Sequence, residues 1–143
     1  MTDTADHQKL RKNRREQWLS SIQEIADLET QRTKWLDPIN TNPHWSFIEI
    51  VCCYFDDLGL DKSKTGYGGW IDHGLITAAE AAAVTDFHAV VSAYKSPKGD
   101  DYDNAAVLND PKWLRVVEAA KAAQSRLAEL ITDANERQIL LHP

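Results

Sequence analysis

Residues 43–58 carry an apolar face that is too wide for an ordinary surface helix. When successive residues are placed about 100° apart, the apolar side chains fill an arc of roughly 200°. Because a surface helix usually needs only about 100° of apolar face, this segment must contact at least two other elements. We therefore predict that it is the central helix. The arc comprises Phe47, Ile48, Ile50, Val51, Cys52, Tyr54, Phe55 and Leu58.

Three further segments have helical periodicity, and we expect them to surround this central helix. The first spans about 7–36, with an apolar line that includes Trp18, Ile22, Ile25 and Leu36. The second begins at a capping box, Thr77 to Glu80, and ends before Pro97. The third begins at Asp110-Pro111, a capping residue followed by proline, and ends near Ala134. The same pattern, Asn42-Pro43, marks the start of the central helix.

The sequence thus predicts an all-α fold, an irregular four-helix bundle in which residues 1–143 form a single domain. Two long loops, about 60–76 and 96–110, interrupt the helical pattern. Loops of this length are more often functional than not. In the first loop we expect Trp70 to fold inward and Tyr67 to be exposed as an aromatic anchor for a partner. The apolar tail at 139–141 either docks or lies exposed.

Charge is distributed unevenly in this chain of net charge −6. Residues 1–15 hold five basic residues against two acidic ones, hence +3, whereas the remainder holds 11 basic against 20 acidic, hence −9. We interpret 1–15 as a polar, basic N-terminal extension of the first helix whose first turns fray or project. A basic arm of this kind is also typical of phosphate binding. Its basic residues are Lys9, Arg11, Lys12, Arg14 and Arg15.

Acidic residues gather in two places where a partner with a basic surface would bind. Glu49, Cys53, Asp56 and Asp57 share the narrow polar stripe of the central helix, with Asp61 just beyond. A second cluster lies in 100–104, where the glycine and glutamate of a calcium loop are missing, so a solvated turn is the simpler interpretation. The predicted partner surface comprises Glu49, Asp56, Asp57, Asp61, Tyr67, Asp100, Asp101 and Asp103.

Neither a metal site nor a cofactor is predicted. The five histidines lack metal-binding spacing, and the adjacent Cys52 and Cys53 point about 100° apart on a helix. The glycine-rich 65–70 segment lacks the Lys-Ser/Thr of a P-loop. His88 is interpreted as a hydrogen-bonded histidine at the core margin. Two neighbouring cysteines, no signal peptide and no apolar run long enough to span a bilayer together favour the cytoplasm.

Three functions fit these features. The favoured hypothesis is a non-enzymatic protein that binds another protein and masks its basic surface, as inhibitors, antitoxins and immunity proteins do. A small enzyme with a carboxylate and histidine site near 61–74, including His73, is the second. A nucleic-acid-associated protein that uses the basic arm is the third, and it is disfavoured because no aromatic residue interleaves the basic cluster.

Overall fold

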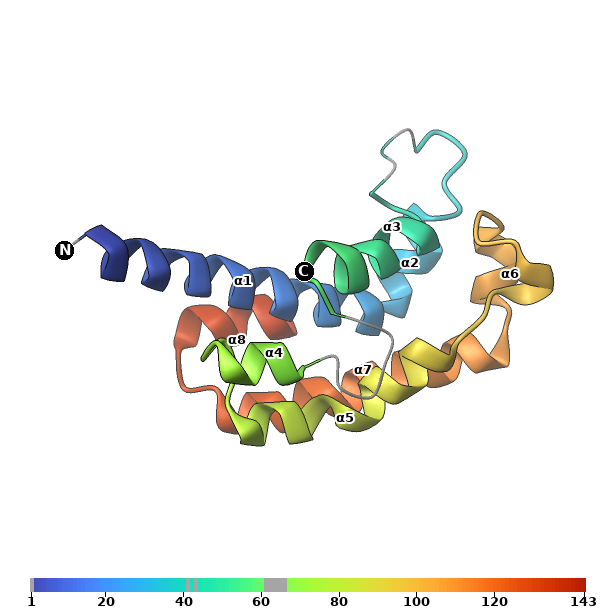
Figure 1. Cartoon of the computed structure of the whole chain (residues 1–143). Coiled ribbons are helices and arrows are strands. Elements are labelled where there is room, and N and C mark those ends of the chain that lie inside the picture. Colours follow the sequence, from blue (N-terminus) through green and yellow to red (C-terminus); the bar gives the residue numbers. More distant parts are fainter. Residues whose placement is uncertain (1, 41, 43, 61–66) are drawn as a thin grey trace.

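The structure is a computed structural model that describes residues 2–40, 42, 44–60 and 67–143. Every regular element in these ranges is helical, and they contain no strand, so the predicted all-α class is confirmed (Figure 1). No helix in them has both the length and the hydropathy needed to cross a membrane. The α-helices are α1 (Thr2–Ala26), α2 (Leu28–Lys34), α3 (Phe47–Cys52), α4 (Gly68–Asp72), α5 (Ala78–Ala93), α6 (Asn104–Leu108), α7 (Pro111–Leu130) and α8 (Ala134–Leu141).

The centre of the fold is formed by α1 and α7, not by residues 43–58 as the sequence predicts. Helix α7 packs against α1, α5, α6 and α8, and it lies beside α5 along most of its length (Figure 1). The 47–58 segment packs mainly against α1 and still buries Phe47, Ile50 and Tyr54 to 5% exposure or less. Its outer apolar residues, Ile48 and Val51, are only half-buried, so one side of the wide arc is covered less fully than the sequence predicts.

A break at Asp27 divides the first predicted helix into α1 and α2. The Asp27 side chain accepts a hydrogen bond from the Thr30 backbone N–H and thereby caps α2. Trp18, Ile22 and Ile25 are fully buried, as predicted, and the early turns of α1 extend beyond the other helices (Figure 1). Leu36 was predicted on the same line but lies beyond the end of α2 and is 48% exposed.

The segment at 43–58 begins later than predicted and is not a regular α-helix. Ser46 caps α3, so the helix does not begin at Asn42-Pro43; Pro43 itself lies outside the described residues. After Cys52 the chain widens into a π-helical turn, η1 (Cys53–Asp57). A π turn holds more residues than an α turn. Tyr54 and Phe55 are both buried in it, as the wide apolar arc predicts.

The two predicted loops contain helices where the structure describes them. Helix α4 lies in the first, and a 3₁₀ turn, η2 (Pro97–Gly99), precedes α6 in the second. The last predicted helix ends at Leu130, and the apolar tail forms a separate helix, α8, whose Leu140 is fully buried. Helices α4, α6 and α8, together with the separate α2, account for the difference between the predicted count of four and the eight α-helices described.

Local capping chemistry is confirmed where the sequence states it directly. Thr77 and Glu80 form the reciprocal capping box at the start of α5. Asp110 caps α7, and Pro111 occupies its first turn. Trp113 and Val116 of α7 are buried while Arg115 and Glu118 on the opposite face are exposed, as expected for an amphipathic helix.

Candidate functional site

Arg15 is not part of a free basic arm but is buried to 5% exposure between three helices. Its guanidinium donates to both carboxylate oxygens of Glu80 on α5, at 3.0 and 2.7 Å, and to both oxygens of Glu136 on α8, at 2.9 and 3.0 Å. A fifth hydrogen bond, of 2.8 Å, reaches the carbonyl of Leu75. We call Arg15, Glu80 and Glu136 the Arg15 cluster. All five N–H groups of the Arg15 guanidinium make these hydrogen bonds, so Arg15 has no donor left for a phosphate.

Electrostatics within the Arg15 cluster favour the charged forms. Burial lowers the pKa of Arg15, but hydrogen bonds and charges from Glu80 and Glu136 outweigh burial and hold that pKa above its ordinary value. Burial raises the pKa of Glu80, but the hydrogen bonds from Arg15 and Thr77 outweigh burial. The pKa of Glu80 is therefore lower than its ordinary value. Arg15 and Glu80 therefore join α1 to α5 as an ion pair, and the hydrogen bonds from Arg15 to Glu136 add α8.

Two more arginines of the predicted basic arm also bind the chain itself. Arg11 Nε donates to the carbonyl of Gly74 at 2.7 Å, and Arg14 Nη1 donates to the carbonyl of Asp57 at 2.8 Å. Lys9 and Lys12 remain exposed. The structure thus leaves fewer cations available for nucleic acid than the sequence predicts.

Tyr67 does not have the exposure that an interface anchor needs. It is 8% exposed, and its hydroxyl accepts a hydrogen bond from Trp18 Nε1 at 2.8 Å and lies 2.6 Å from the Tyr54 hydroxyl. The Tyr54 hydroxyl in turn lies 2.8 Å from Nδ1 of the buried His88. Burial raises the pKa of both tyrosines. This network is core structure, which agrees with the prediction for His88, and Trp70 is buried beside it as predicted.

The structure brings two predicted partner-binding residues, Asp56 and Asp101, to one surface groove of about 160 Å³. Both side chains belong to exposed residues, and Asp101 accepts a hydrogen bond from the Ser96 hydroxyl. Between them lies an apolar floor formed where α3 and η1 meet α5. We call this surface the acid-rimmed groove. It is lined by Phe47, Ile48, Val51, Cys52, Phe55, Asp56, Val91, Tyr94, Ser96 and Asp101.

The remaining predicted acidic residues are not gathered in that groove. Asp100 accepts a hydrogen bond from the backbone N–H of Tyr102, and Asp103 caps α6. Both side chains therefore stabilise local turns, as expected if 100–104 is a solvated turn and not a calcium loop. Glu49 is half-buried on α3, and Asp57 is exposed at the end of η1. Asp61 lies outside the described residues. Among the described residues, no group of three or more acidic, histidine or cysteine side chains is arranged to hold a metal ion.

Cys52 and Cys53 are free thiols in a strongly acidic setting. Burial, together with a hydrogen bond to Asp57 and the charge of that carboxylate, raises the pKa of Cys53 to about 12. Burial and Asp56 raise the pKa of Cys52. Because the thiolate is the nucleophilic form, this setting disfavours covalent catalysis by either cysteine.

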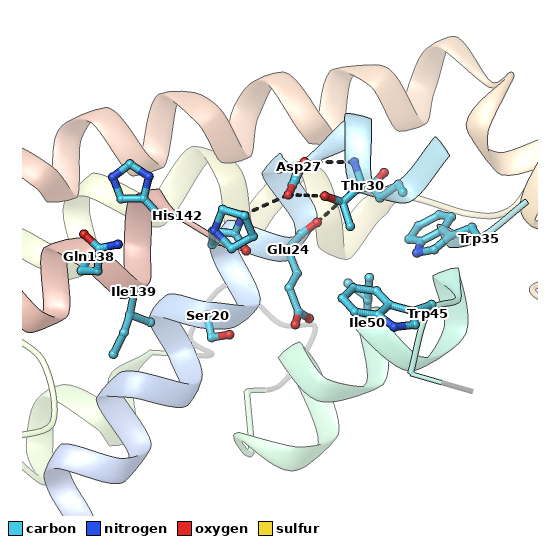
Figure 2. A pocket seen from close by; sticks show the side chains of 13 residues that line it. Ser20, Glu24, Asp27, Thr30, Trp35, Trp45, Ile50, Gln138, Ile139 and His142 are labelled. Atoms are coloured by element: carbon cyan, nitrogen blue, oxygen red, sulfur yellow. Dashed lines mark hydrogen bonds between the residues drawn. The ribbon is translucent and has the colours of Figure 1, made fainter. Parts of the chain in front are cut away.

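A second hollow, which the sequence does not predict, lies between α1, α2, α3 and α8 and has a volume of about 300 Å³. Figure 2 shows Trp35, Trp45 and Ile50 at one end and residues of α8 at the other, with Glu24 projecting from α1 between them. We call it the aromatic cavity. It is lined by Ser20, Gln23, Glu24, Asp27, Thr30, Gln31, Trp35, Trp45, Ile50, Gln138, Ile139, His142 and Pro143.

Comparison with known proteins identifies one family. Residues 10–136 match the model of a family described as "Domain of unknown function (DUF7945)". The chain belongs to this family. No curated protein and no solved structure matches the chain. The matched range contains the whole Arg15 cluster and the acid-rimmed groove, so both are features of the DUF7945 domain in this chain. Four lining residues of the aromatic cavity lie beyond it, namely Gln138, Ile139, His142 and Pro143.

The sequence carries little signal for the aromatic cavity of this DUF7945 domain. Trp45 lies just outside the predicted apolar arc, and Trp35 lies near the end of the first predicted helix. Trp35 lies just after the end of α2, and Trp45 lies just before the cap of α3. Helical periodicity alone does not locate either of these helix ends. Their convergence with α8 depends on the break at Asp27 and on the docking of the apolar tail.

Proposed function

We propose that this protein acts by binding another protein at the acid-rimmed groove, with a basic segment of the partner as its occupant. The observation that carries this proposal is the joint placement of Asp56 and Asp101 around an apolar floor. A groove with acidic edges and an apolar base is complementary to Lys or Arg side chains, whose apolar stems pack while their charged ends meet carboxylates.

Charge around the groove supports a basic partner. The 47–57 segment carries three acidic residues and no basic one, and 94–104 carries three acidic residues against Lys95 and Lys98. The half-buried Ile48 and Val51 add apolar surface that a partner would cover. Masking of a basic surface is the mode of inhibitors, antitoxins and immunity proteins, and we propose this class by analogy. We also propose a cytoplasmic location, consistent with two adjacent free thiols.

A pair of charge-neutralised variants tests this function. Asp56→Asn/Asp101→Asn removes two charges from the groove, and Asp86→Asn/Glu118→Gln removes two from exposed positions on α5 and α7. A lysine- and leucine-containing amphipathic peptide serves as a defined probe, and capture from the native host serves to find the partner. We expect the groove variant alone to lose binding, with affinity falling as salt increases. Equal binding by the two variants would contradict the proposal.

The two other hypotheses have less structural basis. Residues 61–66 of the proposed enzyme site lie outside the described residues, and His73 is exposed beyond the end of α4. Arg11, Arg14 and Arg15 of the basic arm bind Gly74, Asp57 and the Arg15 cluster. We therefore keep the non-enzymatic binding function as the proposal.

A further inference from the structure

The aromatic cavity contains a buried hydrogen-bond donor that has no partner in the described part of the chain. Trp35 is 6% exposed, and its Nε1 makes no hydrogen bond there. In Figure 2 the nitrogen of Trp35 faces the hollow on the side where Trp45 and Ile50 lie. A buried N–H without an acceptor is costly, because water no longer satisfies it. A ligand acceptor in the cavity would remove that cost.

Several other polar groups around the cavity already have hydrogen-bond partners. Asp27 accepts from Thr30 N, Thr30 Oγ1 and Gln23 Nε2. Gln31 donates to the carbonyls of Glu24 and Ile25 and accepts from Trp113 Nε1 at 3.0 Å. These groups hold the wall in place but offer a ligand little new bonding capacity.

Glu24 is an anionic acceptor beside the Trp35 donor, and it lines the same cavity. Its Oε1 lies 2.9 Å from His44 Nε2, and its Oε2 makes no hydrogen bond to any described residue. Its side chain is 19% exposed and projects from α1 toward the end of the cavity that holds Trp45 (Figure 2). One free donor, Trp35 Nε1, and one free carboxylate oxygen therefore border the same hollow.

The walls define the shape of the occupant. The half-buried indole ring of Trp45 gives a flat apolar surface on which a planar ring can stack, whereas Trp35 turns the N–H edge of its ring to the cavity. A volume of about 300 Å³ lies at the lower end of the range for small-molecule pockets. A planar molecule fits these walls if it carries an acceptor for Trp35 and a donor for Glu24.

We propose that the aromatic cavity binds a small amino-substituted nitrogen heterocycle. The ring nitrogen accepts a hydrogen bond from Trp35 Nε1, the exocyclic amino group donates to the Glu24 carboxylate, and the ring packs against Trp45. This site shares no lining residue with the acid-rimmed groove, so it is independent of the proposed protein-binding function. Ile50 of α3 faces the cavity, whereas Ile48 and Val51 of the same helix line the groove.

Calorimetric titration of the full chain with three probes tests this site. The titration is made at a pH at which the ring nitrogens of the probes are unprotonated. There 2-aminoquinoline has both the acceptor and the amino donor, quinoline has only the acceptor, and indole has only a donor. We expect saturable 1:1 binding of 2-aminoquinoline and affinities at least about tenfold weaker for the other two, since each lacks one bond to a buried or half-buried group. Equal affinity for all three would show non-specific apolar binding and overturn the proposal.

Two conservative variants assign the contacts. Trp35→Phe keeps an aromatic wall but removes the N–H, and Glu24→Gln keeps the side-chain length but removes the charge. Each is expected to weaken 2-aminoquinoline binding by about tenfold or more, whereas the control Glu29→Gln, at an exposed site on α2, leaves it unchanged. In the unaltered chain the indole N–H resonance of Trp35 should shift when the probe is added. Undiminished binding by Trp35→Phe, or an unshifted Trp35 resonance at saturation, would overturn the assignment.

Discussion

The guanidinium of Arg15 forms a bidentate ion pair with the carboxylate of Glu80, with an Nη2–Oε2 distance of 2.7 Å and side chains that are each 6% exposed. The pair joins the first long helix to the capping box of α5, because Glu80 also accepts from the Thr77 backbone N–H. One carboxylate thus caps a helix and fixes its position against another. The geometry makes Arg15 a structural residue, although the sequence groups it with an exposed basic arm.

Replacement of Arg15 should destabilise the fold strongly. Arg15→Met leaves Glu80 and Glu136 without their common partner, and breaking a buried ion pair in this way costs about 3–5 kcal/mol. Lys12→Met, at an exposed position one turn earlier in α1, should change the free energy of unfolding by less than about 0.5 kcal/mol. Urea denaturation of both variants measures the difference. Similar losses in the two would show that the Arg15 cluster contributes little.

Glu80 should also make stability depend on pH. Its pKa in the folded protein is lowered, so the folded state favours the charged form. The resulting stabilisation is fully present above the ordinary pKa of 4.5 and is lost as the pH falls through the lower folded value. Glu80→Gln should therefore flatten the decline of unfolding free energy in acid, as measured by denaturation between about pH 6 and pH 3. Glu118→Gln, at an exposed position, is the control and should leave the pH dependence unchanged. If Glu80→Gln also left the decline of unfolding free energy in acid unchanged, this would contradict the lowered pKa of Glu80.

Capping chemistry explains why part of this fold is predictable from the sequence. A Thr77–Glu80 box or an Asp110-Pro111 start depends on residues within one turn, so periodicity and spacing locate both helices. The ion pair at Arg15 joins residues that are 65 positions apart. Nothing in a basic run reveals which of its members will meet a buried carboxylate.

The two candidate sites differ in how much of each is predictable from the sequence. Asp56 belongs to a polar stripe that the sequence identifies, but its placement beside Asp101 requires the packing of η1 against the end of α5. The aromatic cavity requires more, since Trp35, Trp45 and α8 converge only after the break at Asp27. The sequence therefore predicts that acidic residues form the binding surface of the groove, but it does not predict which of them come together. For the aromatic cavity it predicts neither the residues nor their arrangement.

Cys53 should be an unreactive thiol. With its pKa raised to about 12, the thiolate fraction at pH 8 is small. In a Cys52→Ser background, we expect iodoacetamide to alkylate Cys53 at least about a hundredfold more slowly than a free cysteine. Asp57→Asn removes the charge that helps to raise this pKa and should accelerate the reaction. An alkylation rate equal to that of free cysteine and unchanged by Asp57→Asn would show that burial and Asp57 do not raise the pKa of Cys53.

Phe55 tests the burial of the π-helical turn. Its ring is 4% exposed and packs against Tyr54 and His88, with centroid distances of 4.9 and 5.9 Å. Phe55→Ala should lower the free energy of unfolding by about 3–5 kcal/mol because it leaves a cavity. Val90→Ala, at an exposed position on α5, is a control that should cost much less. A loss below about 1 kcal/mol for Phe55→Ala in a denaturant titration would place the ring near solvent.

Loss of the indole N–H should cost more stability at Trp113 than at Trp35, although both tryptophans are buried. Trp113 Nε1 donates to Gln31 Oε1 at 3.0 Å, so Trp113→Phe leaves a buried amide oxygen unpaired and should cost about 1–3 kcal/mol beyond the loss of ring volume. Trp35→Phe loses the same atoms but removes a donor that has no partner among the described residues. Its stability should therefore exceed that of Trp113→Phe by at least about 1 kcal/mol. Urea denaturation of the two variants without ligand measures this difference. Equal losses would mean that the Trp35 N–H is already satisfied in the free protein and that the aromatic cavity has no open donor.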